Sequence, residues 1–175
     1  MLQPTVTVSD FDIGPCQVTF NSTDLGGTSG NVKVKFKYEK AVLRADQYGK
    51  TDLDRAISGM SCSVETEFLE VLNKTNLQKA FPTLILTGTT HKFLDAKNAV
   101  ATRALASASP LKLHPLVDDS TTADNEWYFW KASANEDSEY VFGPAEQAKL
   151  KISWDILLDT SVSPARLFRY GDNSL

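Results

Sequence analysis

Apolar and charged residues alternate strictly through Val32-Lys33-Val34-Lys35-Phe36-Lys37-Tyr38-Glu39. Successive side chains of a β-strand point to opposite faces, so this alternation predicts a half-buried strand with one apolar face and one face rich in lysine. The same pattern returns over residues 59–68 and over residues 149–156. Three long amphipathic strands place the chain in the mainly β class.

Shorter segments of similar character extend the expected sheet, at residues 16–20, 83–87, 100–106, 111–114, 126–132 and 139–142. Residues 95–106 are ambiguous because their alanines favour a helix while Val100 allows a strand, and we predict a strand from Val100. One short helix is expected to begin at Thr75, since Thr75 and Gln78 have the spacing of a capping box, or to begin earlier, since residues 70–72 are good helix formers. It should end before Pro82.

Two connections stand out between these strands. Residues 24–30 are rich in glycine, which adopts a positive φ at little steric cost, and they predict a turn. Residues 45–58 form a long polar stretch between two strong strands. A connection of this length within a compact domain is usually functional, so we expect an arm at about residues 45–58 in a single domain of residues 1–175.

The composition is ordinary for a soluble globular protein. Of the 175 residues, 42% are hydrophobic and 23% charged, which excludes a disordered chain, and no apolar run approaches the ~18 residues of a membrane span. The first residues show no basic segment followed by an apolar one, so we expect no signal peptide and folding in a cytoplasm. Cys16 and Cys62 could form one disulfide, but nothing indicates secretion, and we expect reduced, buried thiols.

Charge is distributed unevenly along the chain. The net charge of −4 disfavours general wrapping of nucleic acid. Residues 31–50 carry six Lys or Arg and two acids, whereas residues 117–146 carry eight acids and one Lys. Patches of opposite sign would let copies of the chain meet each other, and the alternative is two separate solvated faces.

The spacing of the chemically active residues indicates no catalytic or metal site. Gly49-Lys50-Thr51 resembles the end of a P-loop, but Arg44 stands where the first glycine is required. His91 and His114 lack the neighbours of a metal site, and the acids of residues 118–126 lack the order of an EF-hand loop. We therefore predict no enzyme activity, no cofactor and no metal.

The aromatic run Trp127-Tyr128-Phe129-Trp130 predicts two side chains toward the core and two away from it. The outward pair is expected either to be covered by another subunit or to form an exposed patch.

Several turn segments resemble, in their order along nearly the whole chain, those of tail tube (major tail) proteins of tailed bacteriophages. Residues 92–108 lie outside the resemblance. The segments are Asp12-Ile13-Gly14-Pro15, Asp24-Leu25-Gly26-Gly27-Thr28-Ser29-Gly30, Asp46-Gln47-Tyr48-Gly49-Lys50-Thr51, Ser109-Pro110-Leu111-Lys112-Leu113-His114-Pro115 and Leu167-Phe168-Arg169-Tyr170-Gly171-Asp172.

The resemblance implies a two-sheet β-sandwich or partly closed barrel with one short flanking α-helix. It implies a structural virion protein, made in the host cytoplasm, that forms hexameric rings stacked into a tail tube. Genomic DNA would pass through the bore during ejection without specific binding. Further partners would be other tail proteins, such as tape measure, terminator and baseplate or tip proteins, with no membrane insertion.

Edge pairing around a ring would cover the unpaired edges of long amphipathic strands, and stacking, a contact that does not close, would build a filament. On this basis we expect the arm to contact a neighbouring subunit or ring through Asp46, Tyr48, Asp52, Asp54 and Arg55. We also expect Glu65 and Glu67 to face the bore, where carboxylates repel phosphates.

Two alternatives remain open from the sequence. A hexameric secretion-system tube would share the architecture but carry effector proteins. A monomeric β-sandwich module would instead bind a ligand, such as a carbohydrate, through the aromatic side chains of residues 127–130.

Overall fold

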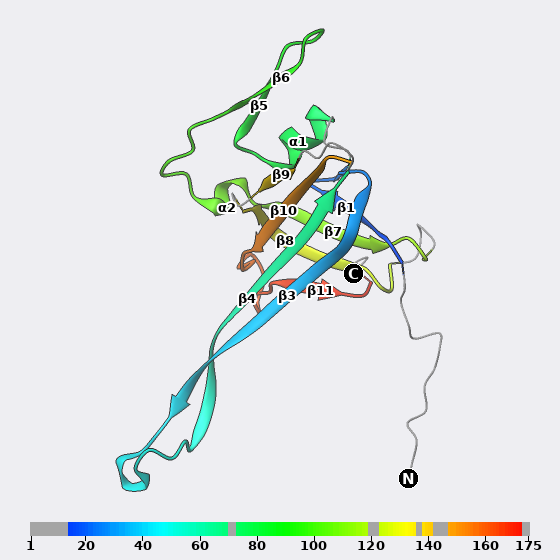
Figure 1. Cartoon of the computed structure of the whole chain (residues 1–175). Coiled ribbons are helices and arrows are strands. Elements are labelled where there is room, and N and C mark those ends of the chain that lie inside the picture. The colour runs from blue at the N-terminus through cyan, green and yellow to red at the C-terminus, as the bar shows by residue number, and fades with distance from the viewer. Residues whose placement is uncertain (1–13, 70–72, 119–122, 136–137, 142–146, 173–175) are drawn as a thin grey trace.

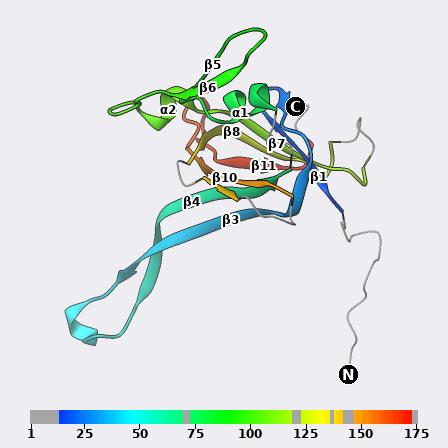
Figure 2. The same ribbon diagram turned by 45° about the horizontal axis from the view of Figure 1, so that its top comes forward.

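The computed structural model describes residues 14–69, 73–118, 123–135, 138–141 and 147–172. Strands account for 53% of the structure and helices for 10%, which confirms the prediction of a mainly β fold. The strands in these residues form a large antiparallel sheet and a small second sheet. The large sheet curves around the core without closing into a barrel (Figures 1 and 2).

Nine of the described strands belong to the large sheet. They are β1 (Cys16–Phe20), β2 (Thr23–Asp24), β3 (Thr28–Leu43), β4 (Asp54–Phe68), β7 (Ser109–Pro115), β8 (Trp127–Ala134), β9 (Glu139–Val141), β10 (Lys149–Ile156) and β11 (Phe168–Tyr170). The strand order is β2-β1-β7-β8-β10-β4-β3, with β11 paired to β8 and β9 paired to β10. The outer strands of this order are therefore β2 and β3.

The core fills the inside of the curved sheet. The rings of Phe20 on β1 and Trp154 on β10 lie 6.0 Å apart, although β7 and β8 separate these strands in the sheet order. Phe68 on β4 meets the same Trp154 edge-on at 6.1 Å. Alternate residues of β10, including Ile152, are buried as the sequence predicts. Fully burying each such side chain is worth about 1.5–3 kcal/mol, so these contacts hold the sheet in its curve.

The second sheet and the helices form a separate group at one end of the molecule. They are α1 (Lys74–Ala80), β5 (Leu84–Thr87), β6 (Phe93–Ala96) and α2 (Ala104–Ser107). The predicted helix is present as α1, but its cap is Asn73, whose side chain accepts a hydrogen bond from the Asn76 amide at 3.2 Å. The predicted capping box at Thr75 is therefore wrong by two residues.

The strand predicted over residues 100–106 is wrong. Ala101 has a φ of 67°, which interrupts an extended chain, and α2 follows directly as a second helix. Alanine is the strongest helix former, and none of the described strands pairs with this segment, so the local helical preference prevails.

The polar arm predicted at residues 45–58 is a shorter tip on a longer two-stranded ribbon. β3 and β4 stay paired out to Leu43 and Asp54, so residues 54–58 are strand, and a 3₁₀ turn, η2 (Asp46–Tyr48), lies in the tip. A β-bulge between the Glu39–Gly59 and Lys40–Ile57 pairs shifts the alternation of β4 by one residue. Because of this shift, the outer part of β4 does not follow the period-two alternation of its inner part, so the alternation did not predict it as strand.

The ribbon and the helical end point away from the body in different directions. In Figure 1 the paired β3, drawn in blue to cyan, and β4, drawn in cyan to blue-green, leave the body toward the bottom left, while α1, α2, β5 and β6 lie at the top. The turned view in Figure 2 shows the same separation. The molecule therefore has two structurally different ends.

Candidate assembly surface

One apolar stripe runs along the ribbon from the core into solvent. Directly paired residues share a face of the sheet, and on the core-facing side Val34 pairs with Val64, Tyr38 with Met60, and Lys40 with Ile57. Val64 is 0% exposed, whereas Ile57 is 65% exposed. We call the outer members of this face the ribbon stripe: Phe36, Tyr38, Val42, Ile57 and Met60.

The base of the ribbon stripe is fixed to the body through aromatic contacts. The Phe36 ring lies 5.9 Å from Phe168 of β11 and 6.4 Å from Tyr38. Phe168 also contacts Trp127 at 5.3 Å. The ribbon thus leaves the body from a packed aromatic base, yet Phe36 itself is half exposed.

The opposite face of the inner ribbon carries mixed charge. The Lys35 ammonium donates to the Glu65 carboxylate at 2.6 Å, and this bond lowers the pKa of Glu65, with a smaller contribution from Lys151 and Lys33. Glu67 lies on the same face and pairs with Lys151 of β10. Glu65 and Glu67, which were expected to face a bore, therefore lie on the side of the sheet that points away from the core. Their neighbours on that side are lysines and not further acids.

The tip of the ribbon is held together by its own charges. Asp52 accepts from Arg44 Nε at 2.8 Å and from Arg55 Nη2 at 3.3 Å, and Asp54 accepts from the Arg55 amide at 2.7 Å. Three of the five predicted contact residues, Asp52, Asp54 and Arg55, thus make contacts within the tip. Arg44 is a member of this cluster that the sequence analysis missed.

The other two predicted contact residues lie together in η2. Tyr48 is 65% exposed and Asp46 is also exposed. An exposed aromatic side chain on a tip that is held together by ion pairs is a typical anchor residue in protein–protein contacts.

The outer edge of β3 is a second unsatisfied feature. β3 ends the strand order and is 16 residues long, so its edge extends over roughly 50 Å. Within the described ranges, no strand pairs with this edge. Four lysines lie along β3 (Lys33, Lys35, Lys37 and Lys40), which is a common protection against unspecific edge pairing.

The aromatic run of β8 alternates as predicted. Phe129 is fully buried and Trp127 packs against the core, whereas Tyr128 and Trp130 form an edge-to-face pair at 5.3 Å. The Arg166 guanidinium lies 3.6 Å from the centre of the Trp130 ring. The outward pair is therefore partly covered by the same chain, which neither of the two sequence-based alternatives anticipated.

Arg166 is itself fixed by a buried acid. Asp159 exchanges two backbone hydrogen bonds with Arg166 and lies 3.6 Å from its Nε. The Ser161 hydroxyl and amide both donate to the Asp159 carboxylate, and these bonds lower its pKa, so the acid stays ionised beside Arg166.

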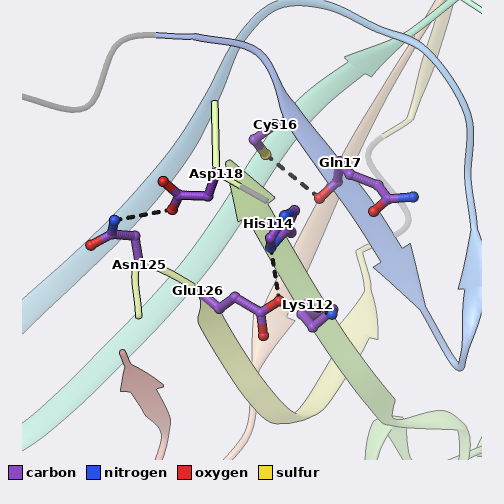
Figure 3. Close-up of polar contacts among 7 residues, drawn as sticks. All are labelled: Cys16, Gln17, Lys112, His114, Asp118, Asn125 and Glu126. Atoms are coloured by element: carbon purple, nitrogen blue, oxygen red, sulfur yellow. Dashed lines mark hydrogen bonds and ion pairs between the residues drawn. The ribbon is translucent and has the colours of Figure 1, made fainter. Parts of the chain in front are cut away.

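A buried polar cluster connects β7 to the start of β8 (Figure 3). Glu126 Oε1 accepts a hydrogen bond from Lys112 Nζ at 2.9 Å and lies 2.9 Å from His114 Nδ1. Nearby, Asn125 Nδ2 donates to Asp118 Oδ2 at 3.0 Å. His114 and two of the acids considered for calcium thus have structural partners, while Asp119 lies outside the described residues.

The two cysteines differ in burial. Cys62 is a buried thiol, and burial raises its pKa to about 11, so this thiol stays protonated. Cys16 is only half-buried, so the prediction of buried thiols is wrong for Cys16. In the described ranges, no three His, Cys, Asp or Glu side chains gather as metal ligands. No helix there has the length and apolar character that crossing a membrane requires.

No known protein family matches the chain, and no curated protein shows similarity to it. The function must therefore be inferred from the ribbon stripe, the tip and the edge of β3.

Proposed function

We propose that the protein is a structural subunit that assembles with copies of itself into hexameric rings, which stack into the tube of a bacteriophage tail. The tube would be part of the virion and would conduct genomic DNA during ejection. The observation that carries this proposal is the ribbon stripe, which continues the core face of β3 and β4 into solvent.

Exposure of the ribbon stripe to water raises the free energy of an isolated subunit. Its five side chains are each at least 39% exposed. Contiguous exposed apolar surface marks an interaction site, and each fully buried large side chain contributes about 1.5–3 kcal/mol. Association that covers the stripe would recover part of this free energy.

The two edges of the large sheet support assembly into a ring. One edge is the long β3, and the other is β1 with the two-residue β2, which covers only Thr19 and Phe20 of β1. These edges differ, so a contact between them is head-to-tail and closes only as a ring. Six copies would join their sheets around a common axis and cover both edges.

The assignment to a DNA conduit rests on the resemblance of the turn segments to tail tube proteins. The mixed charge around Lys35, Glu65, Glu67 and Lys151 is compatible with weak, sequence-independent contact with DNA. A monomeric module that binds through β8 is less supported, because Phe129 is buried and Arg166 covers Trp130. A secretion-system tube predicts the same assembly but different cargo.

The test removes the outer ribbon without disturbing the core. Lys40 and Ile57 are directly paired, so residues 41–56 can be replaced by Asn-Gly, which favours a two-residue hairpin turn. We expect the wild-type protein to form rings and tubes in negative-stain electron microscopy at high concentration, and the shortened variant to remain folded but to form no tubes.

Each result has a defined meaning. A wild-type protein that stays monomeric at high concentration, with natural tail partners added, would contradict the proposal. Tubes of normal appearance from the shortened variant would show that the outer ribbon has no part in assembly. Circular dichroism of the variant supplies the control for folding.

A further inference from the structure

We propose that the Tyr48 side chain of one copy inserts into a pocket at the helical end of the next copy along the tube. This inference rests on the proposed self-assembly and names the partner surface of the ribbon tip. It is carried by a pocket and an exposed aromatic side chain that lie at different ends of the same molecule.

The pocket lies between α1, β5, α2 and the turn after β1. Its volume is about 350 Å³, near the lower end of the ~300–1,000 Å³ of typical ligand pockets. Part of the lining is apolar and part can form hydrogen bonds or ion pairs, and it includes Phe20, Pro82, Leu84, Asn21, Gln78 and Lys79. Such a site accepts an aromatic ring that carries one polar group, which is the chemistry of tyrosine.

The tip presents Tyr48 in a form suited to insertion. Tyr48 is 65% exposed in η2, and the ion pairs of Asp52 with Arg44 and Arg55 join the two sides of the tip. A tip that is already ordered loses little conformational entropy on binding. Tyrosine residues that fill a pocket are among the side chains that contribute most to protein–protein affinity.

The tip is neutral overall, since residues 44–55 carry three Lys or Arg and three Asp, so the electrostatic contribution to this contact is confined to one local pair. Residues 73–107, which contain α1, β5, β6 and α2, carry five Lys or Arg and a single acid, Asp95. Lys79 lines the pocket, and Asp46 begins the same 3₁₀ turn that ends with Tyr48. Inserting Tyr48 would bring the Asp46 carboxylate toward this basic surface, where opposite charges attract.

The positions of pocket and tip make the contact directional. Figures 1 and 2 show the tip and the helical end on separate parts of the molecule, pointing away from each other. A contact between two different surfaces leaves one of each free on every pair, so it propagates as a filament. Ring formation through the sheet edges and stacking through Tyr48 are therefore separable.

The experiment uses two variants of the full chain, each lacking one side of the contact. Tyr48→Ala removes the inserted side chain, and Ala106→Trp fills the pocket from an exposed position in its lining. We expect each variant alone to form rings that do not stack, with at least a tenfold rise in the concentration needed for tubes. Phe93→Ala, exposed at the same end but outside the pocket lining, should stack like the wild type.

Mixing the two kinds of purified rings gives the decisive result. The intact tip of the Ala106→Trp ring should enter the open pocket of the Tyr48→Ala ring, so the mixture should form double rings and stop there. Electron microscopy distinguishes single rings, double rings and tubes. Rings that stack normally in either variant, or a mixture that gives only single rings or long tubes, would overturn the Tyr48 contact.

A charge exchange provides a second, independent readout. Asp46→Lys and Lys79→Asp should each weaken stacking, and the two together in one chain should restore most of it. An absence of rescue would count against the placement of the tip beside Lys79. A wild-type protein that forms no assembly would instead contradict the proposed function, whereas rings that stack without Tyr48 contradict only this contact.

Discussion

The inner and outer halves of the β3–β4 ribbon consist of the same two strands, and apolar side chains of one face continue from the inner half into the outer half, where Lys40 and Arg55 lie beside them. In the inner half, Val64 is fully buried beneath the curved sheet. In the outer half, beyond Gly59, Ile57 and Val42 occupy the continuation of that face and are 65% and 41% exposed. Backbone pairing is continuous across the boundary except for one bulge.

This difference shows that strand formation and burial are separate problems. The cross-strand hydrogen bonds keep the outer strands paired without a core beneath them, whereas the apolar side chains need a second surface to leave water. Within one subunit the inner half has that surface and the outer half lacks it. If a neighbouring copy supplies it, substitutions in the two halves should affect different properties: folding for the inner half and association for the outer half.

The largest effect is expected in the core beneath the inner half. Trp154 is fully buried and contacts both Phe20 and Phe68. We predict that Trp154→Ala lowers the free energy of unfolding by about 3–5 kcal/mol, because it removes a large buried side chain and leaves a cavity. Urea denaturation followed by circular dichroism measures this loss.

Truncation of an aromatic side chain at the tip should hardly change the free energy of unfolding in the same assay. Tyr48→Ala is expected to change the free energy of unfolding by less than about 0.5 kcal/mol, as is usual for exposed positions. Similar destabilisation by both variants would mean that the tip is part of the folded core, and the distinction between the two halves would fail.

Period-two alternation was sufficient to predict the strands that build the core. The apolar positions of residues 59–68 and 149–156 lie on the core-facing side, with Cys62, Val64, Ile152 and Trp154 buried. Alternation identifies which side chains share a face, but it contains no information on where the body ends. The exposure of Ile57 and Val42 therefore could not be predicted from it.

Local signals also failed where a tertiary contact or a competing cap decided the outcome. Asn73 and Thr75 are both good helix caps, and the structure uses Asn73. Asp52 and Arg55 stay predicted contact residues, but the binding of Asp52 to both Arg44 and Arg55 becomes visible only when the ribbon is folded. The pocket beside α1 combines residues from position 20 to position 109, so no sequence window contains it.

The next prediction concerns the polar cluster that joins β7 to β8, in the body and away from the ribbon. Glu126→Gln replaces a carboxylate that interacts with both Lys112 and His114. We expect a loss of about 1–3 kcal/mol in the free energy of unfolding, since the buried His114 and the partly exposed Lys112 lose a charged partner. Urea denaturation measures it, and association should be unaffected once the variant is folded.

Another prediction addresses the outer part of the ribbon stripe directly. Ile57→Ser should change the free energy of unfolding by less than about 0.5 kcal/mol, because Ile57 is largely exposed within one subunit. The same substitution should clearly raise the concentration required for assembly, since it places a hydroxyl on the apolar face. Denaturation and sedimentation of one preparation give both values, and a loss in unfolding free energy with normal assembly would reverse the assignment of this face.

The smallest effect is expected at the charged side of the inner half. The hydrogen bond from Lys35 lowers the pKa of Glu65 in the folded protein, so the ionised carboxylate stabilises the fold above its ordinary pKa. This stability should disappear as the pH falls through the lowered pKa. Because Lys35 is 57% exposed, Glu65→Gln should cost only about 0.2–0.5 kcal/mol at pH 7, and less in high salt.

A double-mutant cycle with Lys35→Gln separates the Glu65 pair from other effects of the substitutions. The coupling between Lys35 and Glu65 should be measurable at neutral pH and absent once Glu65 is protonated in acid. A coupling that persists in acid would mean that packing, not charge, joins these side chains. A coupling well above 1 kcal/mol at neutral pH would mean that this face is shielded from solvent, as happens if neighbouring subunits cover it. The part of the ribbon that needs a neighbouring copy to bury its side chains would then begin closer to the body than Gly59.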